Sequence, residues 1–269
     1  MADYKFTRKE KILKPKIFYR ILSVVFWIVV WWILAGLIGN AILLPTPITV
    51  LGQLWSMLFQ IDTWIAVGTS LLHILLGFFI ATVLGIGMGI FAFHIPLAAR
   101  LMEPLITFAK SVPIAAFIVL AMLWFGADAL SSVIAVLVAF PILYTNTITG
   151  LGNRDRKLLE MAQVMHMPRF KRIYYIDSRA MQPVLYAGVK TAYGMCWKAA
   201  IAAEMIGIAG RTIGEELYMA KIYIETADLF AWMVLIMCCA WVSERILIKG
   251  LGILRKLSGL LFGGLSDNI

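Results

Sequence analysis

The sequence predicts an all-α integral membrane protein with six transmembrane helices and with both termini in the cytoplasm. Of the 269 residues, 62% are hydrophobic and 14% are charged, whereas a typical soluble domain carries about 25% charged residues. The apolar residues gather in several runs that approach the length of about 20 residues needed to cross a bilayer. Lys and Arg cluster between these runs, as they do in cytoplasmic loops. These three observations exclude a large soluble domain.

The first expected span covers residues 21–38 and follows a basic segment over residues 1–20. This apolar run is too long for the core of a secretory signal, and no small-residue cleavage site closes it, so we expect a retained helix. The prolines of Leu44-Pro45-Thr46-Pro47 then interrupt helical structure. Residues 48–60 are expected to form a short surface helix.

The second and third spans are expected over residues 70–93 and 104–125. In the second span, Gly85 and Gly89 are four residues apart, a spacing that allows another helix to approach closely. The third span is interrupted by Pro113. We therefore expect tight packing at the second span and an irregularity within the third.

A tight turn at Gly126 leads into the fourth span, over residues 132–151, which carries the amide of Asn146. The fifth and sixth spans are expected over residues 181–208 and 229–247. Between them lies an outer loop that we expect to be partly helical.

Two charged residues of the fifth span, Lys198 and Glu204, are candidates for function. A charge at the centre of a spanning helix costs about 2.5–3.5 kcal/mol on insertion scales, and such residues usually face a cavity or a partner. Because they are six residues apart, they do not share a helix face. They either line a translocation path or dimer seam, together with Asn146, or are structural ions that pair with other spans.

The distribution of Lys and Arg sets the orientation. Seven of them lie in residues 1–20 and seven in the long polar stretch over residues 153–179, whereas the expected outer side carries only Arg211 and Lys221. The domain organisation is therefore a basic cytoplasmic segment (1–20), a six-helix transmembrane domain (21–249) with a cytoplasmic loop (153–179), and a cytoplasmic tail (250–269). Since the net charge of +9 follows from this topology, no nucleic-acid partner is expected.

The sequence carries no pattern typical of an enzyme. There is no nucleophile elbow, no Cys or His cluster with metal-ligand spacing and no phosphate-binding glycine loop. The three histidines are far apart in the sequence, and the three cysteines lie inside apolar runs. We expect no catalytic residue and no metal site.

The polar stretch over residues 153–179 contains an amphipathic helix that breaks at Met167-Pro168. Its apolar face consists of Leu158, Leu159, Ala162 and Met165. One interpretation is a helix that lies on anionic lipid. The other is a docking element for a cytoplasmic partner.

These segments resemble the membrane subunit, or permease, of ATP-binding-cassette importers, in the branch that includes sulfonate, taurine, nitrate and bicarbonate transporters. The similarity runs in order over residues 44–249. Its pieces are Leu44-Pro45-Thr46-Pro47, Val112-Pro113, Leu123-Trp124-Phe125-Gly126, Pro141-Ile142, Asn146-Thr147, Gly150, Glu160-Met161-Ala162, Pro183, Gly188-Val189-Lys190, Trp197 and Ala203-Glu204. The sequence departs from the family at Met161, at Ser178-Arg179 and at His166, where the family has Gly.

The resemblance implies the type I importer transmembrane fold in the bacterial cytoplasmic membrane, and a subunit that hydrolyses nothing itself. Its expected partners are two ABC ATPase subunits that bind ATP and Mg, a second permease copy in a homodimer, and an extracytoplasmic substrate-binding protein. The residues expected to couple to the ATPase are Leu158, Leu159, Glu160, Ala162, Met165 and His166.

The solute implied by the resemblance is small, with an anion such as a sulfonate, nitrate or bicarbonate favoured and Lys198 supplying positive potential. A vitamin precursor or another small heterocycle is the alternative. A secondary carrier driven by an ion gradient is a further alternative, but such carriers usually show internal repeats, and we detect none. A membrane enzyme would have only Asn146, Lys198 and Glu204 as candidate groups.

Overall fold

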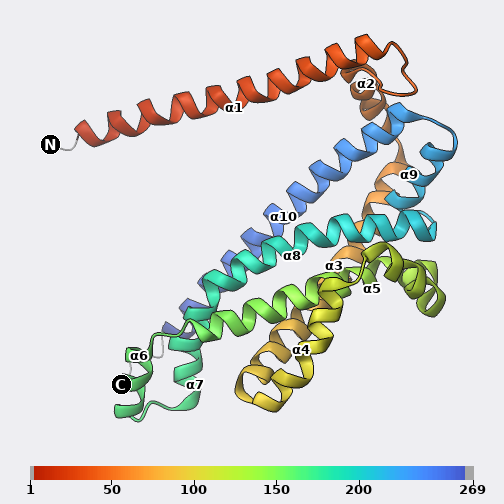
Figure 1. Ribbon diagram of the computed structural model, residues 1–269. Helices are drawn as coiled ribbons and strands as arrows, with labels where there is room; N and C mark the ends of the chain where they lie inside the picture. The colour runs from red at the N-terminus through yellow and green to blue at the C-terminus, as the bar shows by residue number, and fades with distance from the viewer. Residues whose placement is uncertain (1–2, 264–269) are drawn as a thin grey trace. The chain divides into compact units, whose positions relative to one another are not determined.

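The computed structural model describes residues 3–263 of the chain, and every element in them is a helix (Figure 1). The outermost residues of the two predicted cytoplasmic tails, 1–2 and 264–269, lie outside the described residues. The elements are α1 (Asp3–Ile38), α2 (Pro47–Leu58), α3 (Ile61–His94), α4 (Pro96–Ser111), α5 (Ile114–Gly152), α6 (Arg156–Val164), α7 (Arg169–Arg172), the π-helical η1 (Ile173–Asp177), α8 (Ser178–Gly207), α9 (Ile213–Ile222) and α10 (Thr226–Gly263).

Four helices in the described part of the chain are long and apolar enough to cross a membrane. They cover Ile21–Ile38, Ile61–His94, Ile114–Gly152 and Thr226–Ile253. The helix α8 is long enough but is not among them, since its charged and small residues make it less apolar. The interruption expected at Pro113 within 104–125 is confirmed, and it divides that span between two helices: α4 ends at Ser111, Val112 is extended, and α5 begins after Pro113. Proline disfavours helical backbone in the residue before it, which explains the break.

The chain divides into two compact units, and the first comprises Met1–Gln60 with Met219–Leu235. The predicted short helix is confirmed as α2, which Thr46 caps by accepting a hydrogen bond from the backbone of Thr49. The Trp31 indole donates to the carbonyl of Pro45 at 3.1 Å and stacks on the Phe230 ring. This unit is therefore held by polar contacts of the loop after α1 and by aromatic packing.

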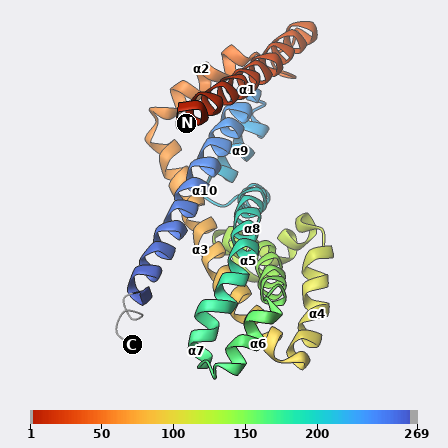
Figure 2. The ribbon, with the colours of Figure 1, turned by 90° about the vertical axis from the view of Figure 1, so that its left-hand side faces the viewer.

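The second unit comprises Ile61–Tyr218 with Ile236–Ile269, and its core is formed by α3, α5 and α8. These three helices lie side by side in both ribbon views (Figures 1 and 2). A Cβ atom added at Gly85 would lie 2.8 Å from the Leu143 Cβ atom, and one at Gly89 would lie 2.7 Å from the Thr147 Cβ atom. The predicted close approach is thus confirmed, with α5 as the helix that packs there.

The turn expected at Gly126 is also confirmed, as a kink inside α5. Gly126 has φ +74° and ψ 178°, which is a backbone conformation that glycine adopts easily. The short first segment of α5, before the kink, contributes Ile118 to a buried cluster with Leu130, Ile134 and Ala203. The kink thereby allows both segments of α5 to bury apolar side chains against α8.

Candidate functional site

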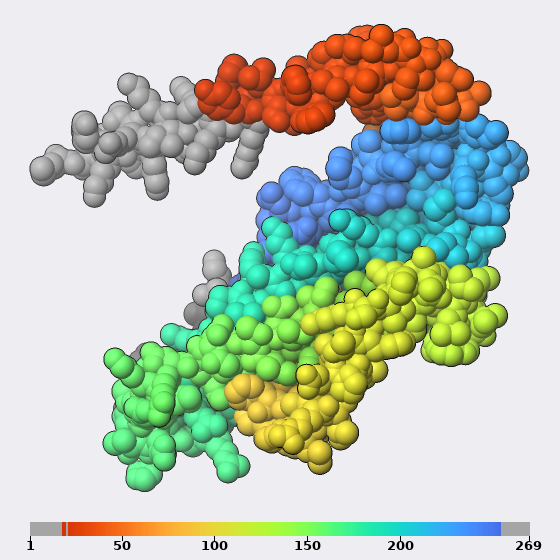
Figure 3. Space-filling model, viewed as in Figure 1, coloured from red at the N-terminus to blue at the C-terminus, as the bar shows by residue number. Residues whose placement is uncertain are grey.

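The loop between α5 and α8 lies at one end of the packed helices of the second unit (Figure 3). The amphipathic helix predicted in it is present as α6. Asp155 caps its N-terminus, since the carboxylate accepts a hydrogen bond from the backbone N–H of Lys157 at 2.8 Å. The cap explains why the helix begins at Arg156.

The end of α6 has the geometry of a Schellman motif. The N–H of His166 donates to the carbonyl of Gln163 at 3.1 Å, and the N–H of Met167 donates to the carbonyl of Ala162 at 2.9 Å. His166 has φ +47°, in the left-handed region where glycine is usual at this position. The turn thus keeps a glycine-like backbone with a histidine side chain on it. Pro168 then precedes the first residue of α7.

The apolar side chains of α6 divide between two faces. Ala162 is buried and Leu159 is half-buried, so these two pack toward the loop itself. Leu158, Met161 and Met165 are exposed, and their spacing of three and four residues places them on one face. We call these three residues the outer stripe. Sequence reasoning missed Met161, although the same spacing could have identified it.

Glu160 lies beside the outer stripe and is exposed. Its carboxylate accepts a hydrogen bond from the Arg156 guanidinium, one turn earlier, at 3.2 Å. An exposed pair of this kind contributes little to stability. The carboxylate of Glu160 is therefore accessible to a partner.

An ion pair closes the base of the loop, and sequence reasoning missed it. The Arg154 guanidinium lies 3.1 Å from the buried carboxylate of Asp177 and stacks over the ring of Phe93, in the last turn of α3. Because 23 residues separate the two charges, no local sequence pattern reveals the pair. It joins the end of α5 to η1, directly before α8.

The three charged or polar residues singled out in the spans lie apart from one another. Glu204 is fully buried, and its carboxylate accepts hydrogen bonds from the Ser70 hydroxyl at 2.7 Å and the Gly214 N–H at 3.3 Å. Asn146 is half-buried in α5, donates to the carbonyl of Ile142 and packs against Gly188. No hydrogen bond or ion pair joins either of them to Lys198.

Lys198 is exposed and lines a hollow between the start of α5 and the C-terminal half of α8, with a volume of about 280 Å³. The other residues that line it are Ile114, Ala115, Ile118, Met195, Ala199, Ala202 and Ile206. Lys198 is thus a single charge in an otherwise apolar hollow. In the described residues, no three His, Cys, Asp or Glu side chains are grouped so that they could hold a metal ion.

Comparison with known proteins identifies relatives along most of the chain. The family described as "Binding-protein-dependent transport system inner membrane component" matches residues 81–244. A permease protein of Escherichia coli (strain K12) named for aliphatic sulfonates transport is 31% identical over 203 residues, which cover 74% of this chain and 76% of the relative. The taurine transport system permease protein of the same organism is 25% identical, and the match covers 80% of each chain. The riboflavin transport system permease protein of Chloroflexus aurantiacus is 27% identical over 78% of this chain and 81% of its own.

Proposed function

The chain belongs to the family of binding-protein-dependent transport system inner membrane components, in the sulfonate and taurine branch of ATP-binding-cassette importer permeases, and we propose that it forms the translocation path for a small solute. It is a multi-pass membrane protein of a transport system, as its relatives and its long apolar helices indicate. The role proposed here is not catalytic.

The proposed assembly contains two copies of this chain, two ABC ATPase subunits that bind ATP and Mg, and a substrate-binding protein that delivers the solute from outside. The membrane is the bacterial cytoplasmic membrane. In it, the chain crosses six times with both termini inside, and residues 153–179 form the cytoplasmic coupling loop between the tails over 1–20 and 250–269. The clusters of Lys and Arg in the loop and the tail over 1–20 support this orientation.

The main support for a role in coupling to the ATPase is the outer stripe of α6. Leu158, Met161 and Met165 expose apolar surface on a loop that is otherwise rich in Arg and Lys. An amphipathic helix that lays such a face in a groove of a partner is a recurring mode of recognition. In this proposal the ATPase supplies the groove, and Glu160 adds a charged contact at its edge.

We expect Met161→Glu to prevent the cognate ATPase from co-purifying with the tagged chain in detergent, because the variant places a charge in the apolar contact. Met219→Glu in α9 is the matched control, since it introduces the same charge at another exposed methionine, which lies on the outer side in this topology. The amount of ATPase recovered per chain is measured. Equal recovery with both variants would contradict a docking role for the outer stripe.

The proposed solute is a small anion, such as a sulfonate, nitrate or bicarbonate. Lys198 supports this choice, because it is the single charged residue among the apolar residues that line this hollow and would attract an anion there. The riboflavin relative supports the alternative of a small heterocycle such as a vitamin precursor. A carrier driven by an ion gradient is a weaker alternative.

We expect Lys198→Met to lower ATP-driven uptake of a sulfonate into proteoliposomes by about tenfold or more, as loss of one hydrogen bond to a charged group does. Lys198→Arg keeps the charge and is expected to retain most of the uptake. Unchanged uptake by a correctly assembled Lys198→Met complex would favour an uncharged solute. Uptake that follows an ion gradient without ATP would favour the secondary carrier.

A further inference from the structure

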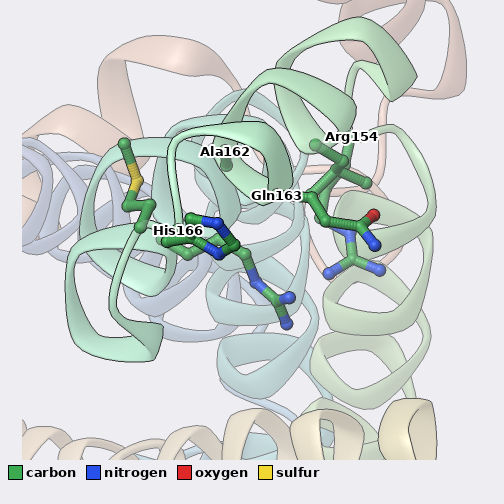
Figure 4. A pocket seen from close by; sticks show the side chains of 7 residues that line it. Arg154, Ala162, Gln163 and His166 are labelled. Carbon is green, nitrogen blue, oxygen red and sulfur yellow. The ribbon is translucent and has the colours of Figure 1, made fainter.

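The coupling loop contains a second hollow, of about 470 Å³, between α6 and α7 (Figure 4). Its lining comes from the end of α5, from α6 and the turn after it, and from α7. The lining residues are Arg154, Leu159, Ala162, Gln163, His166, Met167 and Arg172. Figure 4 shows Arg154 and Gln163 together on one side of the hollow and His166 on the other. The outer stripe lies on a different face of α6.

The hollow has an excess of positive charge. Arg154 is neutralised by Asp177, but Arg172 has no ion-pair partner among the described residues. The Nε atoms of both arginines are buried and have no hydrogen-bond partner there. These two Nε atoms lie beneath the lining, whereas both arginine side chains line the hollow itself. The unpaired positive charge of Arg172 therefore favours a ligand that supplies acceptor oxygens and negative charge.

The turn at His166 places another donor at the same hollow. A residue other than glycine held at φ +47° is strained, and strain of this kind is concentrated at sites that bind ligands. Here it holds the imidazole on the wall of the hollow, opposite Gln163 and Arg154 (Figure 4). The donors come from different segments of the loop and lie on two sides of the space, which suits an oxyanion whose acceptor oxygens point in several directions.

We infer that this hollow binds a phosphate group, with Arg172 as the main charged contact and with Arg154, His166 and Gln163 as further donors. Arginine is well suited to this role because its planar guanidinium can donate two parallel hydrogen bonds to a phosphate. The phosphate belongs either to the headgroup of an anionic lipid or to a free phosphate ion. The hollow lies within reach of headgroups, because Arg154 follows α5 by two residues and stacks on Phe93 at the end of α3.

The test uses the purified full chain in detergent and measures its thermal unfolding midpoint. It is titrated with inorganic phosphate and, separately, with dihexanoyl phosphatidylglycerol, because a ligand that binds the folded state raises the midpoint. The variants are Arg172→Gln and, as matched control, Lys171→Gln. Both remove one positive charge from α7, but Lys171 does not line the hollow.

We expect one of the two probes to stabilise the parent and Lys171→Gln, and Arg172→Gln to need about tenfold more of it, given the strength of a hydrogen bond to a charged group. The effective probe identifies the source of the phosphate. Arg172→Lys keeps the charge but loses the planar guanidinium, so the concentration of probe that it needs is expected to lie between those of the parent and Arg172→Gln. It also provides the test if Arg172→Gln does not fold. Stabilisation that is equal in the parent, Arg172→Gln and Lys171→Gln, or absent with both probes, would overturn the inference.

Discussion

The carboxylate of Glu204 connects α8 to two other helices. It accepts hydrogen bonds from Ser70 in α3 and from Gly214 in α9, and the Ser70 hydroxyl in turn accepts one from the N–H of Ile213. The sequence predicts that such a residue either lines a path or dimer seam or pairs with another span, because an unpaired charge in a span is costly. It does not predict which partner, since 134 residues separate Ser70 from Glu204.

We expect Glu204→Ala to lower the free energy of unfolding by about 2–6 kcal/mol, because two buried donors lose their acceptor and each costs about 1–3 kcal/mol. Glu204→Gln retains an acceptor oxygen at the same place and is expected to cost clearly less. Unfolding of the purified chain in detergent measures the difference. If alanine and glutamine destabilise equally, the hydrogen bonds do not account for the role of Glu204.

His166 shows the other limit of prediction at the level of single residues. The sequence identifies it as a departure from the glycine of the family, and the structure shows that the backbone keeps the left-handed conformation of that glycine. The position of its side chain at a hollow depends on α7 and on the end of α5. It therefore follows from tertiary structure and not from the local pattern.

The helices themselves were largely predictable, because apolar runs, prolines and glycines act locally. The spans expected over 70–93 and 229–247 lie within α3 and α10, and the one expected over 181–208 coincides with α8 except at its ends. Pro113 predicts an interruption within 104–125, but hydropathy treats this apolar run as a single span, whereas the structure divides it between α4 and α5. Hydropathy alone does not register that a proline ends one helix and begins another.

The packing of α3 against α5 provides a test with a control on the same helix. Gly85→Ala is expected to destabilise the protein by about 1–3 kcal/mol, as overpacking does, because the new Cβ atom would lie 2.8 Å from that of Leu143. Gly87→Ala meets no atom within 4 Å and is expected to be neutral or stabilising. Unfolding in detergent compares the two, and equal effects would contradict the close approach.

At the scale of the whole molecule, membrane topology is the property that connects the sequence to the proposed function. In the proposed function, residues 153–179 meet an ATPase only if they are cytoplasmic, and the proposed six-span topology then places the segment around α9 outside. The bias of Lys and Arg argues for this arrangement independently of any relative.

Labelling with a membrane-impermeant maleimide tests the orientation. In a background of Cys238→Ser and Cys239→Ser, we expect Tyr223→Cys to react in intact spheroplasts and Val164→Cys to react only after the membrane is opened, because both positions are highly exposed and the topology places them on opposite sides. Cys196 is buried and remains as an internal control. The reverse labelling pattern would invert the topology and place the coupling loop outside.

The glycine face of α3 has a mechanical consequence. At Gly77, Gly85 and Gly89 the α3 side of the contact has no side chain, so its backbone lies directly against the backbone and Cβ atoms of α5. If α3 slid along α5, its backbone would clash with side chains of α5. The two helices are therefore expected to move together as one rigid pair. Bending is easier where the backbone already departs from helical dihedral angles, at Val112-Pro113 and at Gly126. If a path opens through this unit, we expect a hinge motion at Val112-Pro113 and at Gly126, while the packed pair of α3 and α5 stays fixed.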